Sequence, residues 1–312
     1  MKKTEKMLCY PAGEGREIQI PVVTLEGDAP GPHAVITAGI HGCEYPPILA
    51  AAEFCRTCDL RDIRGTVTVV TISTLESFRT RTPFVCPVDG KNPNRFFPGD
   101  LNGTYTQQLT YHLFHDIIAG ADYHIDLHCG DMTETLAPFC EFGTGYSEKV
   151  DAMSRDIALY SGMPSLGESN LNADPGDLPQ GLNYLNSVQH GVAGAIVEIG
   201  QMGRTDREYV DGQLFCIRNV LRRMGNLAGE AVPTADPAWF TTYETVYAPV
   251  QGIFERCVEA GTDVKAGQKI GEIWDYFGNP VAQVHVPADG RILYLTSSIA
   301  VEKDGFLLDM VH

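Results

Sequence analysis

The chain has 312 residues, of which 44% are hydrophobic and 20% are charged. A chain of this length and composition buries a sizeable core and commonly forms a main domain with a smaller one beside it. The formal charge of −17 excludes a nucleic-acid partner, because phosphate binding needs a basic stripe that this sequence lacks.

No apolar run approaches the roughly 20 residues that a membrane-spanning helix needs, and the negative charge disfavours adsorption to anionic membranes. The basic residues that follow Met1 do not lead into the apolar stretch of a signal peptide. We therefore expect a cytoplasmic protein whose nine cysteines are reduced thiols. The same charge repels anions at long range, so an acidic ligand would have to meet a local cluster of arginines.

The first part of the chain, to about residue 230, alternates strand-like and helix-like segments, the pattern of an α/β layer fold. Apolar and β-branched runs predict strands, and two polar segments rich in Pro, Gly, Asn and Asp predict long loops at residues 73–103 and 167–181. In chain order, the expected strands are His33–Ile40, Thr66–Ile72, Tyr123–Leu127, Leu136–Phe142 and Gly194–Ile199, and the expected helices are Pro46–Cys58, Tyr105–Ala119, Ser147–Ser161, Leu182–His190 and Asp206–Ala228.

The sequence changes in character near residue 235. Beyond it, short β-rich runs alternate with glycines, and turn signals at such short spacing predict a small β domain. We therefore expect an α/β domain over residues 1–235 and a β-rich domain over residues 236–312.

Three side chains of the metal-ligand type lie where predicted strands end. His41 and Glu44 occupy the turn that follows the strand His33–Ile40, and His128 ends the alternating run that begins at Tyr123. In open α/β sheets, ligands bind beyond the carboxyl ends of the strands. Zinc accepts imidazole nitrogen and carboxylate oxygen, and a catalytic site has three protein ligands and one open position. These residues predict one zinc ion per chain, although His and Glu ligands also suit other divalent metals.

The alternation in the second strand leaves a competing ligand. His124, Asp126 and His128 are expected on one face of the strand, because successive side chains point to opposite faces. His124 is the competitor, and its other interpretation is a core histidine satisfied by hydrogen bonds. We favour His128 because it lies at the end of the strand. Asp126 would then orient an imidazole by accepting its second ring proton.

A fourth residue, Glu198, lies in the apolar run AIVEIG near the carboxyl end of its own predicted strand. A buried carboxylate is costly unless it is paired or lies at a strand end. Beside a metal-bound water, a desolvated Glu has a pKa suited to general-base work. The alternative is a salt-bridged residue at the edge of the sheet.

Taken together, the motifs GIHGCE, NPNRFFPG, DLHCGD and VEIG resemble the succinylglutamate desuccinylase/aspartoacylase family of the zinc carboxypeptidase clan. The motifs occur in order between about residues 33 and 200. The resemblance implies a mixed open sheet flanked by helices. It also implies that His41, Glu44 and His128 bind one zinc ion and that Glu198 is the general base.

The same resemblance implies residues that hold the substrate. Asn94 and Arg95 of the NPNRFFPG motif would bind its carboxylate, which suits the planar fork of an arginine. Arg81, or else Arg79, would stabilise the oxyanion, and we favour Arg81. Tyr184 stands where some members have a substrate-contacting tyrosine, although helix packing explains it equally well.

The sequence departs from the family pattern at two points. Asn92-Pro93 replaces the usual Asp-Leu before the Asn-Arg pair. Val188 stands where aspartoacylases keep a second arginine, which makes a dicarboxylic amide such as N-acetylaspartate a less natural substrate.

The C-terminal segment resembles a β-sandwich of the lipoyl/biotinyl type through its turns GTDVKAGQ and VPADG, but residues 273–280 between them lack the carrier lysine. In related deacylases this domain narrows the active-site cleft, which would exclude peptides. We therefore expect a zinc-dependent deacylase that cleaves the amide bond of a small N-acyl amino acid or related amide. The alternatives are a metallocarboxypeptidase acting on peptides and a non-catalytic, zinc-dependent ligand-binding protein. The sequence does not identify the acyl group or the amine half of the substrate. It is also compatible with a homo-oligomer.

Overall fold

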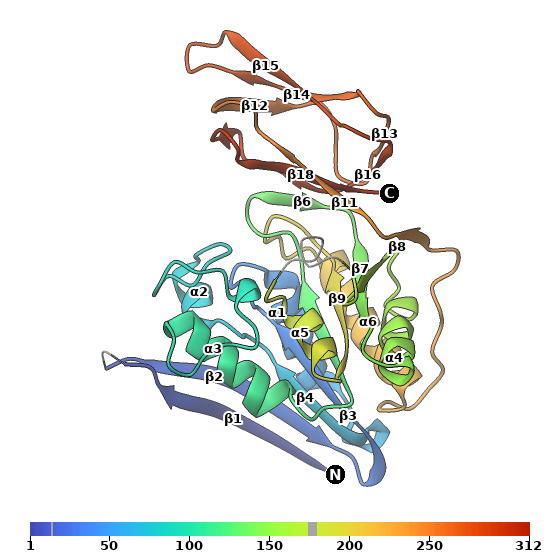
Figure 1. Ribbon diagram of the computed structural model, residues 1–312. Coiled ribbons are helices and arrows are strands. Elements are labelled where there is room, and N and C mark those ends of the chain that lie inside the picture. Colours follow the sequence, from blue (N-terminus) through green and yellow to red (C-terminus); the bar gives the residue numbers. More distant parts are fainter. Residues whose placement is uncertain (14, 174–179) are drawn as a thin grey trace.

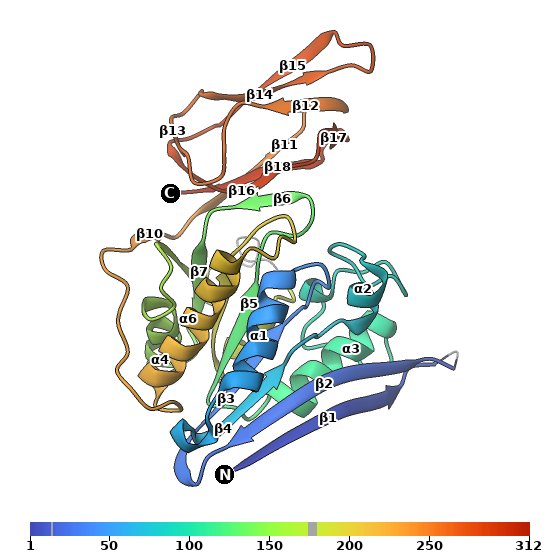
Figure 2. The same cartoon turned by 180° about the vertical axis from the view of Figure 1, so that it is seen from behind.

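The computed structural model describes residues 1–13, 15–173 and 180–312. A large α/β part carries a smaller β part at one end (Figure 1). The N-terminus lies at the far end of the α/β part, and the C-terminus lies where the two parts meet (Figures 1 and 2).

A mixed, nine-stranded sheet forms the centre of the α/β part, in the order β1-β2-β4-β3-β5-β9-β7-β8-β10. The neighbours β4, β3, β5 and β9 run parallel to one another, whereas β2 and β7 are antiparallel to their partners β4 and β9. The strands are β1 (Lys2–Pro11), β2 (Glu17–Glu26), β3 (Ala29–Ala38), β4 (Arg64–Val70), β5 (Tyr123–His128), β7 (Phe139–Thr144), β8 (Ser165–Asn170), β9 (Ala193–Glu198) and β10 (Ala238–Phe240).

Helices cover both faces of this sheet (Figures 1 and 2). One face packs against α1, α4 and α6 in a large hydrophobic cluster, and the other packs against α3 and α5. The helices are α1 (Tyr45–Thr57), α2 (Leu75–Thr80), α3 (Tyr105–Leu113), α4 (Glu148–Leu159), α5 (Asn183–Gln189) and α6 (Arg207–Met224). The expected sheet flanked by helices is thereby confirmed.

Strand β5 shows how polar groups reach the middle of this sheet. All of its residues are buried, because helices lie on both sides. Ile125 joins the cluster beneath α1 and α6. His124 and Asp126 face the other side, where the Thr37 hydroxyl lies 2.7 Å from His124 Nε2 and donates to Asp126 Oδ1 at 2.6 Å. The alternating residues of β5 therefore give the strand one hydrophobic face and one polar face.

The helices expected before residue 235 are present, and so are the expected strands except one that is divided; their ends shift by a few residues, and three further details are wrong. The segment 73–103 is not loop throughout, because it contains α2 and a 3-10 turn at Pro93–Arg95. The helix expected to reach Ala119 continues beyond Leu113 as a π-helical turn, Phe114–Ile118. The loop expected at 167–181 begins inside β8, and residues 174–179 of it lie outside the described residues.

The strand expected over Leu136–Phe142 is divided. Strand β6 (Glu134–Leu136) ends before Pro138, and β7 begins after it. A proline has no N–H to donate to a strand ladder. The break lets β6 leave the large sheet and pair with β16 of the C-terminal part, with Leu136 opposite Tyr294.

The C-terminal part consists of two antiparallel sheets, β11-β18-β16-β13 with β6 added and β15-β14-β12-β17. Their facing side chains share one hydrophobic cluster that includes Val246, Phe254, Ile273 and Leu308. The likeness to lipoyl/biotinyl domains and the division at residue 235 stay predictions. The strands are β11 (Tyr243–Tyr247), β12 (Gly252–Arg256), β13 (Asp263–Val264), β14 (Lys269–Trp274), β15 (Pro280–His285), β16 (Gly290–Thr296), β17 (Ala300–Val301) and β18 (Phe306–Val311).

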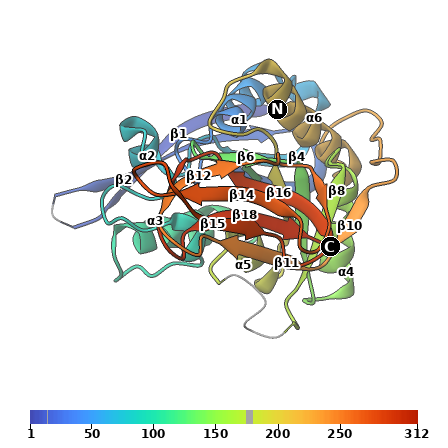
Figure 3. The ribbon, with the colours of Figure 1, turned by 90° about the horizontal axis from the view of Figure 1, so that it is seen from above.

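The first of these sheets lies across the end of the α/β part. Viewed from above, β16 and β18 cross over its middle (Figure 3). A separate hydrophobic cluster fills the junction, formed by Leu136, Phe139, Phe240, Leu293 and Val311. Side chains of β16 and β18 that face the α/β part therefore lie above the carboxyl ends of its central strands.

Leu293→Ala tests this junction. The Leu293 side chain is fully buried, and removing a buried leucine costs about 2–5 kcal/mol of unfolding free energy because it leaves a cavity. We expect a clear fall in the midpoint of urea denaturation. Leu101→Ala is the matched control, since Leu101 is 50% exposed and its loss should change stability by about 0.5 kcal/mol or less. Equal midpoints for the two variants would contradict the junction.

Candidate metal centre and active site

The turn between β3 and α1 carries His41 and Glu44. Glu44 N–H donates to the His41 carbonyl oxygen at 3.3 Å, which closes the turn. The turn also packs directly on the middle of α2, since a Cβ at Gly42 would come within 2.2 Å of the Phe78 backbone nitrogen. Only glycine fits there, and this close approach holds the turn against α2.

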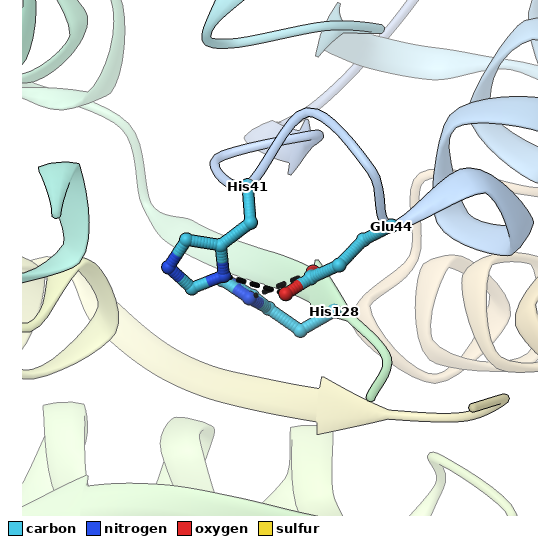
Figure 4. Close-up of side chains that lie close together, drawn as sticks. All are labelled: His41, Glu44 and His128. Atoms are coloured by element: carbon cyan, nitrogen blue, oxygen red, sulfur yellow. Dashed lines mark hydrogen bonds and ion pairs between the residues drawn. The ribbon is translucent and has the colours of Figure 1, made fainter. Parts of the chain in front are cut away.

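Three side chains converge at this turn (Figure 4). His41 Nδ1 lies 2.5 Å from one carboxylate oxygen of Glu44, and His128 Nδ1 lies 3.0 Å from the other. Glu44 and His128 are almost wholly buried, and the ligand atoms of all three lie within 4.8 Å of one another. The three residues form a cluster that can hold a metal ion.

The remaining ring nitrogens decide between the two histidines of β5. His124 has both nitrogens occupied, by Thr37 Oγ1 at 2.7 Å and by Ser187 Oγ at 2.9 Å. Burial lowers the pKa of His124 to about 4, so it is neutral. His128 Nε2 faces Asp126 Oδ2 at 3.3 Å, which leaves Nδ1 directed at Glu44. His124 is therefore the hydrogen-bonded core histidine, and His128 is the one in the cluster.

Glu198 lies beside the cluster on the neighbouring strand. In the sheet register it is opposite His128 on one side and Phe139 on the other. It is 4% exposed, and its Oε2 has no hydrogen-bond partner among the described residues. Burial raises the pKa of Glu198 well above its usual range, against the opposing charge of His128 and a hydrogen bond from Tyr294.

The NPNRFFPG segment runs along the same rim. The Asn92 side-chain oxygen lies 3.0 Å from His41 Nε2 and also accepts the Asn94 N–H at 2.9 Å. The Asn94 side-chain oxygen accepts the N–H of Asn183 at the start of α5, at 2.8 Å. In the sequence, Asn92 was notable only as a departure from the family pattern. In the structure, its side chain contacts His41 of the cluster.

Arg95 points its charge towards the C-terminal part. Its guanidinium donates to the Asn94 carbonyl oxygen at 2.6 Å. Burial lowers the pKa of Arg95, and the negative charge of Asp309 on β18 opposes that shift. Asp309 on β18 therefore partly compensates the positive charge of Arg95. Arg95 forms no direct ion pair with another described residue.

The two candidate oxyanion arginines, Arg79 and Arg81, interact with different parts of the protein. Arg79 donates to Gln19 on β2 at 3.1 Å. Arg81 ends α2 in a left-handed conformation, with φ of 56°. Burial raises the pKa of Cys43 and of Tyr45, and the charge of Arg81 partly opposes both shifts. Arg81 is therefore the arginine near the turn of His41 and Glu44.

Tyr184 is not in the cluster. Its side chain is 1% exposed and packs with Leu185 and Ile196. Its hydroxyl donates to Ser169 Oγ at 3.3 Å.

Sequence reasoning missed the residues that the C-terminal sheet adds, above all Tyr294 beside Glu198 and Asp309 near Arg95. Nothing local in the sequence signals them, because their position depends on how β16 and β18 lie over the other part.

The chain is similar to known proteins along most of its length. The model of the succinylglutamate desuccinylase/aspartoacylase catalytic domain matches residues 30–224. The chain is 26% identical over 282 residues to an N-alpha-acetyl-L-2,4-diaminobutyric acid deacetylase of Halomonas elongata, covering 87% of this chain and 79% of that protein. Its relatives are thus deacylases. Within the part of the chain that the structure describes, no helix is long and apolar enough to span a membrane.

Solved structures share the fold. The product-bound ectoine utilization protein EutE (DoeB) of Ruegeria pomeroyi superimposes with a TM-score of 0.88 at 22% identity, covering 99% of this chain and 95% of that one. A succinylglutamate desuccinylase/aspartoacylase of Rhodobacter sphaeroides gives a TM-score of 0.86 at 22% identity, with the same coverage. Because the family model matches more than half of its residues, this chain belongs to the succinylglutamate desuccinylase/aspartoacylase family.

Proposed function

We propose that this protein is a zinc-dependent deacylase that hydrolyses the amide bond of a small N-acyl amino acid. The observation that carries the proposal is the cluster of His41, Glu44 and His128 with the buried, half-unpaired carboxylate of Glu198 on the next strand. The deacetylase of Halomonas elongata supports the reaction class.

The cluster fits zinc by its chemistry. It offers two imidazole nitrogens and one carboxylate, a donor set that zinc accepts. Ligand atoms of His41, Glu44 and His128 lie within 4.8 Å of one another, so all three residues could hold one ion. Asp126 beside His128 Nε2 is the partner that a ligating imidazole commonly has. When bound, zinc would lower the pKa of a water molecule and polarise the amide carbonyl.

The chain's own residues divide the remaining work. Glu198 takes a proton from the attacking water and passes it to the leaving nitrogen. Arg81 stabilises negative charge that develops on the carbonyl oxygen. Arg95, with the side-chain amide nitrogen of Asn94, holds the carboxylate of the substrate and so fixes the scissile bond.

Two rival functions have less support. A metallocarboxypeptidase needs room for a peptide, whereas β16 and β18 lie over the end of the α/β part, close enough for Tyr294 of β16 to affect the pKa of Glu198. A non-catalytic zinc protein would not explain the buried carboxylate of Glu198. It also fits the cluster less well, because structural zinc is usually bound by four protein ligands and the cluster has three.

Glu198→Gln tests the base. Glutamine keeps the size of the side chain but cannot accept the proton, so we expect kcat for N-acetyl amino acids to fall about 10²–10⁴-fold while zinc content is unchanged. Glu255→Gln, at an exposed position of β12, should keep full activity. Near wild-type turnover by Glu198→Gln would contradict the assignment.

His128→Ala tests the metal site. Removing one of three ligands should reduce zinc content from about one per chain to a small fraction, measured by plasma mass spectrometry after gel filtration. His285→Ala, which removes an exposed histidine from β15, is the matched control. Equal zinc content in both variants, with both folded by circular dichroism, would remove His128 from the site.

Arg95→Met tests recognition of the carboxylate. A hydrogen bond to a charged group contributes about 1.5–3 kcal/mol, so KM for N-acetyl amino acids should rise about 10–100-fold. The corresponding amino-acid carboxamides lack the charge, so their KM should change much less. Arg291→Met is the control, since Arg291 pairs with Asp263 on the C-terminal part. Equal effects on acids and carboxamides would show that Arg95 does not bind the carboxylate.

A further inference from the structure

A buried carboxylate that the mechanism above does not use, that of Asp131, connects the turn after β5 to the loop of residues 81–86 that follows α2. Its side chain is 0% exposed. One oxygen, Oδ2, accepts the Phe84 N–H at 2.7 Å, and the other, Oδ1, accepts the Met132 N–H at 2.6 Å. Burying a carboxylate is costly unless hydrogen bonds compensate, so these two bonds matter to the folded protein.

Asp131 is fixed on its own side of this connection. Its carbonyl oxygen accepts the Glu134 N–H at 2.9 Å, and its own N–H donates to Glu134 Oε2 at 3.2 Å. Glu134 begins β6, which pairs with β16. Just before Asp131, the Gly130 N–H donates to the Gly200 carbonyl oxygen at 3.0 Å. The carboxylate is therefore a fixed point of attachment for the 81–86 loop.

The 81–86 loop has an unfavourable backbone conformation at two residues. Arg81 and Phe84 both have a φ of 56°, in the left-handed region that disfavours residues with a Cβ. Such a conformation persists only where the surrounding structure imposes it. On one side α2 does so, because the Thr82 N–H donates to the Ser77 carbonyl oxygen at 3.0 Å. On the other side, the bond from Phe84 to Asp131 does so.

The same loop lies against the metal centre. The Phe84 ring meets the His41 ring edge-on, with the two centroids 6.3 Å apart. Arg81 and Asp131 also share a neighbour in Cys43. Burial raises the pKa of the Cys43 thiol, the negative charge of Asp131 adds to that shift, and the charge of Arg81 opposes it. Arg81 is itself exposed, so the backbone of the loop has to set its position.

We propose that Asp131 is a positioning residue, which holds the 81–86 loop against the metal centre through its bond to the Phe84 N–H and so keeps the Arg81 guanidinium near the cluster. This inference rests on the proposed deacylase function, in which Arg81 stabilises the oxyanion. Without the bond, the loop can leave its left-handed conformation. Arg81 then moves away from the carbonyl oxygen on which negative charge develops.

Asp131→Ala tests the attachment by hydrogen exchange on the purified protein. The lost bond to a charged group should make exchange of residues 82–86 about 10–100-fold faster, because local opening no longer has to break it. Exchange in α4 should stay that of the wild type, which separates local from global loosening. Asp59→Ala is the matched control, because Asp59 also accepts a backbone N–H, that of Arg61, beyond the far end of α1. Wild-type exchange of residues 82–86 in Asp131→Ala would overturn the attachment.

A double-mutant cycle tests whether Asp131 acts through Arg81. We expect Asp131→Ala to lower kcat for N-acetyl amino acids about 10–100-fold with KM nearly unchanged, since a misplaced group stabilises the transition state less. In an Arg81→Met background, the same substitution should lower kcat by less than about threefold, because the effects of coupled residues do not add. Asp59→Ala should leave kcat unchanged in both backgrounds. Additive effects of Asp131→Ala and Arg81→Met would overturn the positioning role.

Asp131→Asn keeps the inference testable if the alanine variant does not fold. A neutral amide forms a weaker hydrogen bond than a carboxylate, so residues 82–86 should exchange faster than in the wild type and kcat should be lower. A change in only one of these quantities, or in neither, would overturn the proposal. If the wild-type protein hydrolyses no N-acyl amino acid, the deacylase function fails and the role of Arg81 fails with it, whereas the exchange measurement still decides whether Asp131 holds the loop.

Discussion

The buried negative charge at one edge of the sheet is the constraint on which the rest of the site depends. Glu44 and Asp126 are almost wholly inaccessible, and Glu198 is 4% exposed. The ion-pair partners that Glu44 and Asp126 have within the described part of the chain are the two imidazoles of His41 and His128. A low-dielectric interior tolerates such a group only with compensating charge. The two imidazoles supply part of that charge, and the cluster of His41, Glu44 and His128 could hold a metal ion that would supply more.

The sheet formed by β11, β18, β16 and β13 brings residues of the C-terminal part to the site. Because β6 leaves the large sheet immediately after the metal-centre segment and pairs with β16, the C-terminal part is tied to the site by backbone hydrogen bonds. Tyr294 then contacts Glu198, and Tyr243 contacts Glu141. The C-terminal part therefore lies close to Glu198, the proposed base, and this supports the proposal that the substrate is small.

The α/β core was predictable because its signals are local. The alternation of β5 indicated which side chains share a face, and the strand ends indicated where His41, Glu44 and His128 meet. The choice between His124 and His128 was decided only by the partners of each ring, which a sequence does not contain. Pro138 was a visible sign that one strand was two, and Asn92 was visible as a departure before its contact with His41 gave it a role. Tyr294, Tyr243 and Asp309 had no such sign, because they are far from the site in the sequence and approach it only through the packing of the two parts.

The most direct test of the central claim is to measure metal content and hydrolysis of a panel of N-acyl amino acids on one purified sample. We expect about one zinc ion per chain and release of a free amino acid that a chelator abolishes and added zinc restores. A folded protein that binds no metal would contradict the metal centre, and a zinc-loaded protein that hydrolyses none of the amides would contradict the deacylase function.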